Sequence, residues 1–529
     1  MKQGRIAKKI VAGALALSLT AGLTAGLAGA APAGALDSWF SQPSGWAAAD
    51  VERAEDEGLL KPYYIMSDLK GDITRQEFAV LAVTLAQKMG LLVELYGSDL
   101  AEAPFTDIDY ISAKPYVTAA WNLGLMNGVS ATEFAPSRTI TRMEICTLLS
   151  RVMEKCGVDL PQTVAGVEAR LDSGAEGVVP DWARQGIVDI VGAGLMQGGD
   201  NGSLALTAQT SREQAMILAL RSLDLGGGIL EEQNFTAAER EKIAQLRALR
   251  ATFGNPGEPY AQAPSVSAPY SPGVLNDAFL QDGLNSINYI RAVAGLDAVT
   301  MSGEKNQNAQ VGAILLAASG FSHYPGQPAD MPDDLYKQGY AATSTSNIGS
   351  GYANLSSFNL SCADDSDASN ITRLGHRRWL LDPTLTTVGM GYAERRVLTQ
   401  VTDGLYTRWT GPDYVTWPSE GVFPSELFNE NLAWSCSLSP DVYGSNRDGL
   451  TVTVTDGSGH TWTGQASSQV DTTADFVLLE GTGYGGAPAV IFRPAGLEYR
   501  TGRPLTVTIS GLQLKSGGTG TITYTVKLF

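Results

Sequence analysis

A motif that occurs three times constrains the fold of the first half of the chain more than any other feature. Successive copies lie about 70 residues apart, and near-constant spacing of this kind predicts one structural unit repeated along the chain. The copies read Ile73-Thr74-Arg75-Gln76-Glu77-Phe78, Ile140-Thr141-Arg142-Met143-Glu144-Ile145 and, more loosely, Thr210-Ser211-Arg212-Glu213-Gln214-Ala215.

Each copy has the pattern of a helix start. Thr74 and Thr141 are good N-cap residues, and the glutamate three positions later completes a capping box. Apolar residues follow at helical spacing, as at Phe78, Leu81 and Leu85. A shorter helix and a glycine turn precede each copy. We therefore expect an all-α module of three repeats, at about 36–95, 100–160 and 175–225.

The arginine of the motif is not needed for capping, yet it stands at the same place in all three copies. A guanidinium beside the free N–H groups of a helix N-terminus suits a carboxylate. Arg75, Arg142 and Arg212 are therefore candidate anion-binding residues. The alternative is that the motif serves only to start helices.

The motif, with Trp-Ala and Gly-Leu-Met elements upstream, resembles the S-layer homology (SLH) repeat. The resemblance implies a three-pronged module that binds pyruvylated secondary cell-wall polysaccharide, or a peptidoglycan-linked glycan, through the pyruvate carboxylate. The third copy departs from the pattern at Ser211 and Gln214, so we expect its groove to be weaker or silent and Arg212 to be structural or binding. The residues that the resemblance implicates are Arg75, Arg142, Arg212, Glu77, Glu144, Trp46 and Trp182.

The N-terminus predicts export. Basic residues from Lys2 to Lys9 precede an apolar stretch from Ile10 to Ala30, and small residues then fit signal cleavage near Ala30 or Ala35. The alternative is an uncleaved anchor. No later stretch has the roughly twenty apolar residues of a membrane helix, so we expect no span after cleavage.

Retention at the cell surface is expected to depend on a folded binding module, because residues 521–529 lack the apolar tail and basic end of a wall-sorting signal. The formal net charge of −18 and the pI of about 4.7 argue against a nucleic-acid partner.

The four cysteines do not predict a disulfide framework. Cys146 and Cys156 fall in one predicted helix, about 15 Å apart along its axis, and cannot bond to each other. Cys362 and Cys436 could pair, although free buried thiols are favoured.

The composition changes after the repeats. Residues 231–250 are charged with a helical pattern, and residues 255–272 are rich in Pro, Ala and Ser, which is typical of an extended linker. The predicted organisation is a signal peptide (1–35), repeats (36–225), a linker (226–272), a central domain (273–395) and a β-rich domain (396–529).

The central domain contains two of the three histidines in the chain. His323 follows a predicted Ala-rich helix, and His376 lies in Leu374-Gly375-His376-Arg377-Arg378. A single histidine is most often structural, whereas two at such junctions suggest a shared site. Imidazole can bind a divalent metal such as Zn or act as a general base near neutral pH.

This order of elements resembles the CAP superfamily of cysteine-rich secretory and plant pathogenesis-related proteins, especially its bacterial secreted members. The resemblance implies an α/β/α sandwich in which His323 and His376 face one cleft, usually with one or two glutamates. Here Ser346 replaces the first glutamate, and the second falls in a stretch with only Asp364, Asp365 and Asp367. One of these aspartates could supply a carboxylate, although a solvated loop is favoured.

These departures leave the chemistry of the cleft open. Two histidines are fewer than the three protein ligands of catalytic zinc, and no motif places a nucleophilic serine beside a histidine. Catalytic candidates are His323, His376 and Ser346, the last more simply a polar replacement. The leading hypothesis is a surface module whose cleft binds an unidentified ligand or partner. The alternative is a divalent-metal-dependent hydrolase.

Short alternating segments near the C-terminus predict a β-sandwich, because turn residues separate them. Trp409, Trp417 and Trp434 could line a glycan-binding face of an adhesin, although packing between domains is favoured. His460 follows a glycine turn and is expected to be exposed and inert. The predicted strands are 449–455, 489–492, 504–509 and 521–529.

Overall fold

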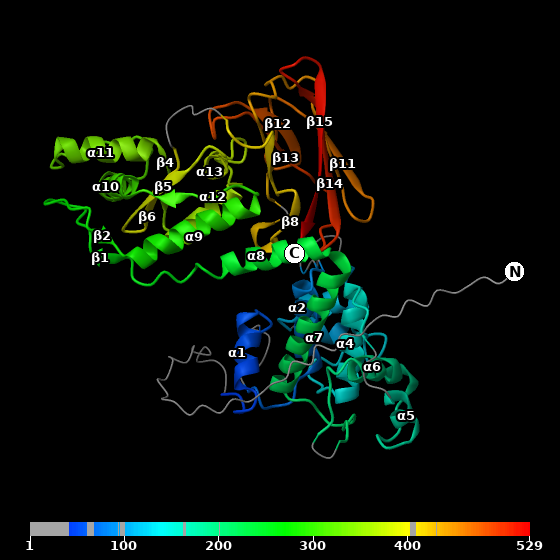
Figure 1. The fold of residues 1–529 in the computed structure, drawn as a ribbon. Helices are drawn as coiled ribbons and strands as arrows, with labels where there is room; N and C mark the ends of the chain where they lie inside the picture. Colours follow the sequence, from blue (N-terminus) through cyan, green and yellow to red (C-terminus); the bar gives the residue numbers. More distant parts are fainter. Residues whose placement is uncertain are drawn as a thin grey trace.

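The computed structural model shows a multidomain chain of helices and sheets (Figure 1). The predicted signal segment lies outside the described residues. Within the described part of the chain, no helix is both long and apolar enough to cross a membrane. The structure describes residues 42–60, 68–91, 93, 95, 101–109, 111–161, 166–199, 202–402, 409–429 and 431–529.

The first part is helical. Its three long helices, α2, α4 and α7, each begin at a motif arginine, and all three have complete capping boxes, so the predicted helix starts are confirmed. The third capping box uses Ser211 and Gln214 in place of Thr and Glu. The elements are α1 (Ala48–Asp56), α2 (Arg75–Lys88), η1 (Thr106–Ile108), α3 (Lys114–Asn122), α4 (Arg142–Cys156), α5 (Val167–Asp172), α6 (Asp181–Gly192) and α7 (Arg212–Asn234).

A closed ring of backbone hydrogen bonds joins the residues just before these three helices. The N–H of Ile73 donates to the carbonyl of Thr210 at 2.9 Å, Ile140 to Ile73 at 3.2 Å, and Thr210 to Ile140 at 3.3 Å. Each repeat therefore bonds to the next, and the third bonds back to the first. The apolar faces of the helices form one core, which no single repeat could bury alone.

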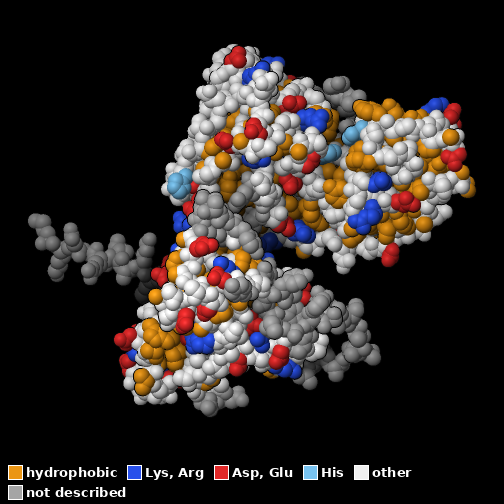
Figure 2. Space-filling view, turned by 180° about the vertical axis from the view of Figure 1, so that it is seen from behind, with side chains coloured by type: hydrophobic (Ala, Val, Ile, Leu, Met, Phe, Trp, Pro, Cys, Tyr) orange, Lys and Arg blue, Asp and Glu red, His pale blue; other side chains and the backbone are white. Residues whose placement is uncertain are grey.

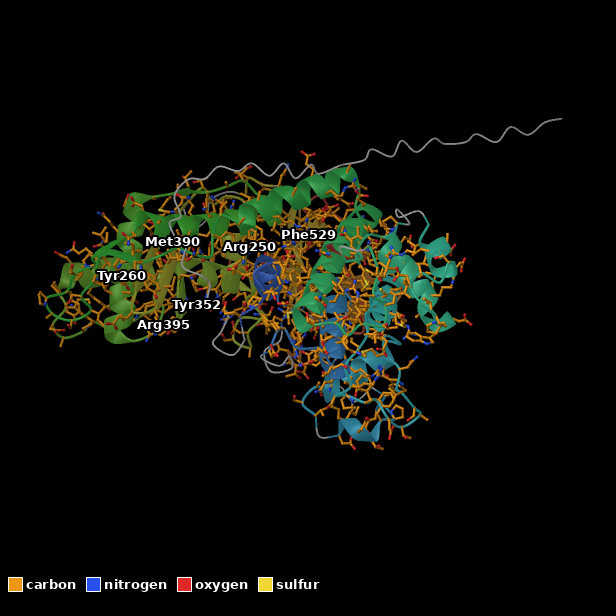
Figure 3. All side chains as sticks on the ribbon, turned by 90° about the horizontal axis from the view of Figure 1, so that it is seen from below. Arg250, Tyr260, Tyr352, Met390, Arg395 and Phe529 are labelled. Atoms are coloured by element: carbon orange, nitrogen blue, oxygen red, sulfur yellow. The ribbon has the colours of Figure 1, made fainter. Side chains whose placement is uncertain are left out.

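In the segment predicted as a linker, the helical pattern of residues 231–250 is confirmed, but this half is packed against a core and is not an extended linker. Helix α7 runs without a break to Asn234, and α8 (Ala237–Arg250) follows at once. Ile243 and Leu246 of α8 are buried in a core shared with the central and C-terminal parts. Helix α8 therefore packs against these parts through its periodic apolar residues. Figure 3 shows Arg250 near Phe529, and Arg247 of α8 lies over the ring of Phe529.

The central part is a four-stranded sheet in the order β3-β5-β6-β4. Strand β6 pairs with both β4 and β5, so the sheet extends past the boundary predicted at 395. The elements are β1 (Tyr260–Gln262), β2 (Val274–Leu275), α9 (Asp277–Val293), β3 (Thr300–Met301), α10 (Gly303–Ser319), α11 (Asp333–Ser344), β4 (Ser346–Ser350), α12 (Leu355–Asp364), α13 (Gly375–Leu380), β5 (Thr387–Ala393) and β6 (Arg396–Gln400).

Helices cover both faces of this sheet, as the alternation along β5 shows. Gly389 and Gly391 face α10, where a Cβ atom on either would lie 2.2 Å from its backbone. The residue between them, Met390, points the other way, and its Sδ would lie 2.7 Å from a Cβ placed on Gly283 of α9. The two glycines thus let α10 lie directly against the strand.

The C-terminal part consists of two packed sheets, with strand orders β11-β10-β14-β15-β8 and β12-β13-β9-β7. Trp409, Trp417 and Trp434 are buried in the core shared with the central part, so they cannot form an exposed glycan-binding face. His460 is largely exposed, as expected. The elements are β7 (Tyr414–Trp417), β8 (Gly421–Phe423), η2 (Ser425–Leu427), β9 (Trp434–Leu438), β10 (Thr451–Thr455), β11 (Thr461–Gln465), β12 (Phe476–Glu480), β13 (Ala489–Arg493), β14 (Pro504–Gln513) and β15 (Thr519–Leu528).

The four cysteines, all among the described residues, are free thiols. Cys146 and Cys156 share helix α4, as the sequence predicted. Burial raises the pKa of each of these two thiols to about 12, so both are protonated at neutral pH. Cys362 and Cys436 are buried and unpaired with each other.

Candidate functional site

The motif arginines tie each long helix to the loop of the next repeat. Arg75 and Arg142 each donate from Nε and Nη2 to two backbone carbonyls, at 2.6 to 3.0 Å. Arg75 also lies over the ring of Phe134, 4.7 Å from its centroid. Part of each guanidinium is therefore committed to structure. The accepting residues are Phe134 and Asn127 for Arg75, and Leu204 and Gln197 for Arg142.

Arg212 is held by a buried ion pair, which Arg75 and Arg142 do not form with any described residue. Its Nε donates to Oε1 of Glu77 at 3.0 Å, and the Glu77 side chain is 0% exposed. The other carboxylate oxygen of Glu77 accepts from the N–H and hydroxyl of Thr74 in the capping box. Arg212 thus closes the ring of repeats onto the first one, which is the structural role that the sequence left open. The placement of Glu77 is explained without a glycan.

Glu144 is the counterpart of Glu77 in the second repeat and is also engaged. It completes the capping box with Thr141 and pairs with Arg138 at 2.5 Å. Burial alone would raise the pKa of Glu144, but the hydrogen bonds from Thr141 and Arg138 outweigh it and lower the pKa. Burial also lowers the pKa of the Arg75 guanidinium, and the nearby charge of Arg138 adds to this effect while Glu144 opposes it. The surroundings of Arg75 are therefore of mixed charge.

Arg142 lies in an open groove of about 210 Å³ to which all three repeats contribute. Trp46 comes from the first repeat, Arg142 from the second, and Gln214 and Arg221 from helix α7 of the third. Trp46 is 63% exposed, which is unusual for a large apolar ring. Trp182 is also exposed, at 54%. An exposed ring beside a cation offers a stacking surface and a charge-assisted donor to one acidic sugar.

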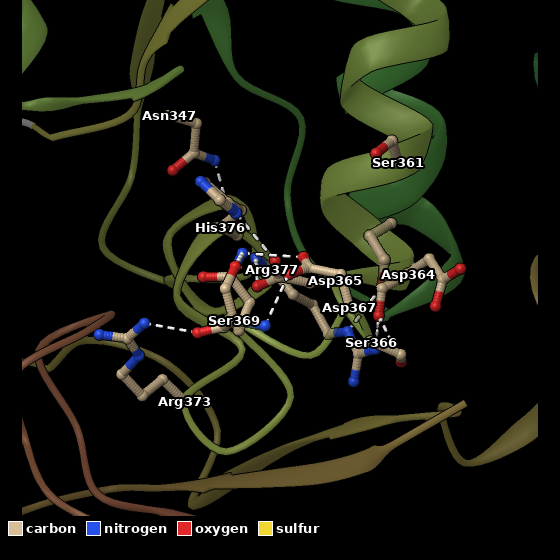
Figure 4. A network of polar contacts seen from close by, with 12 residues as sticks. Asn347, Ser361, Asp364, Asp365, Ser366, Asp367, Ser369, Arg373, His376 and Arg377 are labelled. Atoms are coloured by element: carbon tan, nitrogen blue, oxygen red, sulfur yellow. Dashed lines mark hydrogen bonds and ion pairs between the residues drawn. The ribbon is translucent and has the colours of Figure 1, made fainter. Parts of the chain in front are cut away.

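The second candidate site surrounds His376, at the start of α13 (Figure 4). Its Nδ1 lies 2.8 Å from Oδ1 of Asp365, whose side chain is 1% exposed. The second oxygen of Asp365 accepts the N–H of Arg377 at 3.2 Å. Asn347 on β4 donates from Nδ2 to the carbonyl of His376 at 3.0 Å. The ring of His376 is thus fixed by its own neighbours.

Asp365 is a functional candidate that the sequence favoured only as part of a solvated loop. It caps α12 in the left-handed region, at φ 48°, and this turn carries the carboxylate inward. Asp364 remains exposed, whereas Asp367 accepts hydrogen bonds from Ser369 and Asn370. Burial is the largest single effect on the pKa of Asp367 and raises it, but these bonds together outweigh burial and lower the pKa. The left-handed cap was the signal that sequence inspection could not supply.

His323 follows α10 and is held in a similar way. Its Nδ1 lies 2.9 Å from the carbonyl of Thr343, whose hydroxyl donates back to the carbonyl of His323 at 3.1 Å. A carbonyl and a carboxylate only accept, so Nδ1 is the donor in both His323 and His376, and Nε2 carries the lone pair of the neutral ring. Histidine side chains gather at one place on the central part in Figure 2.

The part of the chain that the structure describes adds no third metal ligand to the two histidines. Within the described residues, no group of three His, Cys, Asp or Glu side chains could hold a metal ion, so this donor set does not fit a three-ligand zinc site. The hydroxyl of Ser346 is buried and has no hydrogen-bond partner among the described residues. Among the described residues, no base is hydrogen-bonded to it. Metal or catalytic roles for His323, His376 and Ser346 stay predictions.

We expect Asp365→Asn to lower the free energy of unfolding by about 1 kcal/mol, because a charged hydrogen bond to His376 is replaced by a neutral one. Asparagine tolerates the left-handed conformation, so the backbone should be preserved. Urea unfolding checks this, with Asp364→Asn, at the exposed neighbour, as the control. Equal effects of the two substitutions would show that the pairing with His376 contributes nothing.

Comparisons with known families match two separate parts of the chain. A model of the CAP, or cysteine-rich secretory protein, family matches residues 284–402, and a model of the S-layer homology domain matches residues 104–146. The chain thus carries an SLH domain followed by a CAP domain. The SLH domain indicates a bacterial cell-surface or cell-wall-associated protein.

A curated relative shares a smaller part of the sequence. An endoglucanase from Bacillus sp. (strain KSM-635) is 26% identical over 151 residues, which is 27% of this chain. The match spans only 15% of the endoglucanase.

Proposed function

We propose that the exported protein is anchored non-covalently to wall polysaccharide by its helical module and displays the CAP domain as a ligand-binding unit. The groove that combines Trp46, Arg142 and α7 is the observation that carries this proposal. It places an exposed aromatic ring, a cation and a hydrogen-bonding amide together. This combination suits a pyruvylated secondary cell-wall polysaccharide or a peptidoglycan-linked glycan, whose sugars can stack and whose carboxylate accepts hydrogen bonds.

The packing of the other two parts supports display as one body. The central and C-terminal parts share a hydrophobic core, and α8 packs against α9 and β8. Lys527 of β15 pairs with Glu239 of α8 at 2.9 Å. The displayed unit is therefore the CAP domain together with the β-rich part, joined to the anchor where α7 ends.

The CAP cleft is proposed to bind a ligand or partner through the two Nε2 atoms. Both rings are oriented by fixed acceptors on Nδ1, so Nε2 of His323 and His376 can accept a hydrogen bond. A divalent-metal-dependent hydrolase has less support, because the described residues contribute no third ligand. An adhesin that uses the buried tryptophans has less support for the reason given above.

Anchoring is tested by Arg142→Gln combined with Trp46→Ala. We expect binding of the full chain to purified cell walls to weaken by at least about tenfold, since exposed Trp and Arg side chains dominate such interfaces. A co-sedimentation assay measures this. Arg184→Gln, at an exposed arginine of α6 paired with Asp172, is the control. Undiminished retention of the double variant would overturn the assignment.

A further inference from the structure

We propose that the three grooves of the anchor are unequal, and that Gln214 makes the Arg142 groove the principal site for a carboxylate-bearing sugar. This inference rests on the proposed binding of wall polysaccharide. Its basis is the ring of repeats, in which each motif arginine faces the long helix of the following repeat. The charge beside an arginine is therefore set by its neighbour's helix and not by its own.

The residue at the third position of the facing helix differs among the three grooves. Arg212 faces α2 and meets Glu77, which neutralises it in a buried pair at 3.0 Å. Arg75 faces α4, where Glu144 is present but already paired with Arg138. Arg142 faces α7, where the corresponding residue is Gln214. Only the Arg142 groove has a neutral side chain at this position.

Gln214 nevertheless keeps the structural half of the glutamate's role. Its Oε1 accepts the N–H of Ser211 at 3.2 Å, so the capping box is complete. Gln214 does not, however, present to Arg142 the negative charge that a glutamate would carry. An incoming carboxylate therefore meets a cation that has no internal counter-charge to displace.

A second cation strengthens the same groove. Nine residues after the motif arginine, α7 carries Arg221, α4 carries Arg151 and α2 carries Thr84. Arg221 lines the groove, is exposed, and has no recorded partner within the described residues. Arg151 donates to the carbonyl of Leu125, and Thr84 is buried and uncharged. The groove of Arg142 thus has two arginines and no carboxylate in its lining.

The residue equivalent to Trp46 also differs in exposure among the repeats. The Arg142 groove has Trp46, which is 63% exposed. The equivalent residues of the second and third repeats are Tyr116, which is 7% exposed, and Trp182, which is 54% exposed. In the Arg142 groove, the stacking surface of Trp46 therefore lies together with the uncompensated charge. Arg212 is paired with Glu77, and the position equivalent to Arg221 on the helix that it faces is Thr84.

The test is Gln214→Glu in the full chain, because it adds the missing charge and keeps the capping box that Glu77 and Glu144 already make. We expect affinity for purified wall polysaccharide to fall by about tenfold, as the new carboxylate pairs with Arg142 and repels the ligand. Gln281→Glu, on an exposed face of α9, makes the same change in net charge away from the anchor and should bind like the wild type. Isothermal titration calorimetry measures both.

A second variant and a treated ligand make the result specific. Arg221→Gln should weaken binding more than Arg151→Gln. Polysaccharide stripped of ketal-linked pyruvate by mild acid should no longer distinguish Gln214→Glu from the wild type. Equal affinity of Gln214→Glu and wild type for the intact polysaccharide would overturn this inference and leave anchoring in place. Absence of wild-type binding would overturn the proposed function and this inference together.

Discussion

Arg377→Ala should lower the free energy of unfolding of the displayed body by about 3–5 kcal/mol, because it leaves buried acceptors without a donor. The Arg377 side chain is fully buried and donates to the carbonyls of Ala363 and Ala433 at 2.6 Å each, and to Asp364. It thereby joins the end of α12 to the residue before β9. Burial lowers the pKa of Arg377 to about 10, yet the guanidinium stays charged at neutral pH.

The measurement is urea unfolding followed by tryptophan fluorescence, since the buried Trp434 adjoins Ala433. Arg447→Ala, at an exposed arginine of the β-rich part, should leave the midpoint unchanged. Arg377→Lys retains the charge but cannot reach several carbonyls at once, so an intermediate loss is expected. If Arg377→Ala and Arg447→Ala unfold at the same urea concentration, the guanidinium does not hold the CAP domain to the sandwich.

Gly391→Ala should cost about 3 kcal/mol through a clash with the backbone of α10. A Cβ atom at this position would lie 2.2 Å from the carbonyl oxygen of Ala309 and 2.5 Å from the nitrogen of Gln310. Neither atom belongs to a flexible side chain, so α10 has to move away from β5. The expected readout is a lower melting temperature of the CAP domain.

Gly303→Ala is the matched control for this substitution. Gly303 opens α10, and a Cβ atom placed on it would meet nothing within 4 Å. Alanine there should be neutral or stabilise by up to about 1 kcal/mol. Equal melting temperatures of Gly391→Ala and Gly303→Ala would contradict the close approach of α10 to the sheet.

The sequence predicted the helix starts that depend on neighbouring residues. The starts of α2, α4 and α7 follow from capping residues beside apolar periodicity, and the structure has all three. The packing of α8 was missed because it depends on surfaces outside the segment itself, namely α9 and the distant strand β8. Strand β6 was assigned to the wrong side of a boundary. It forms a hairpin with β5 across the predicted boundary, and its second pairing, with β4, is not local.

The candidate sites also depend on contacts that the sequence alone did not predict. The sequence identified His323 and His376 but could not show that Asp365 turns inward at a left-handed cap. From the sequence, we also interpreted Gln214 as weakening the groove of its own repeat. The ring places Gln214 in the groove that contains Arg142 of the preceding repeat. Which repeat a substitution affects is therefore decided by how the repeats are closed on one another.

The continuity of α7 has a mechanical consequence for a protein held at a wall. The helix begins in the ring at Arg212 and ends at Asn234, where Lys527 of β15 contacts its last carbonyl. Drag on the displayed body would therefore be transmitted along one uninterrupted helix. At its base the tension is divided between the other two repeats by the backbone bonds of Thr210. No single repeat can be pulled away without opening the ring.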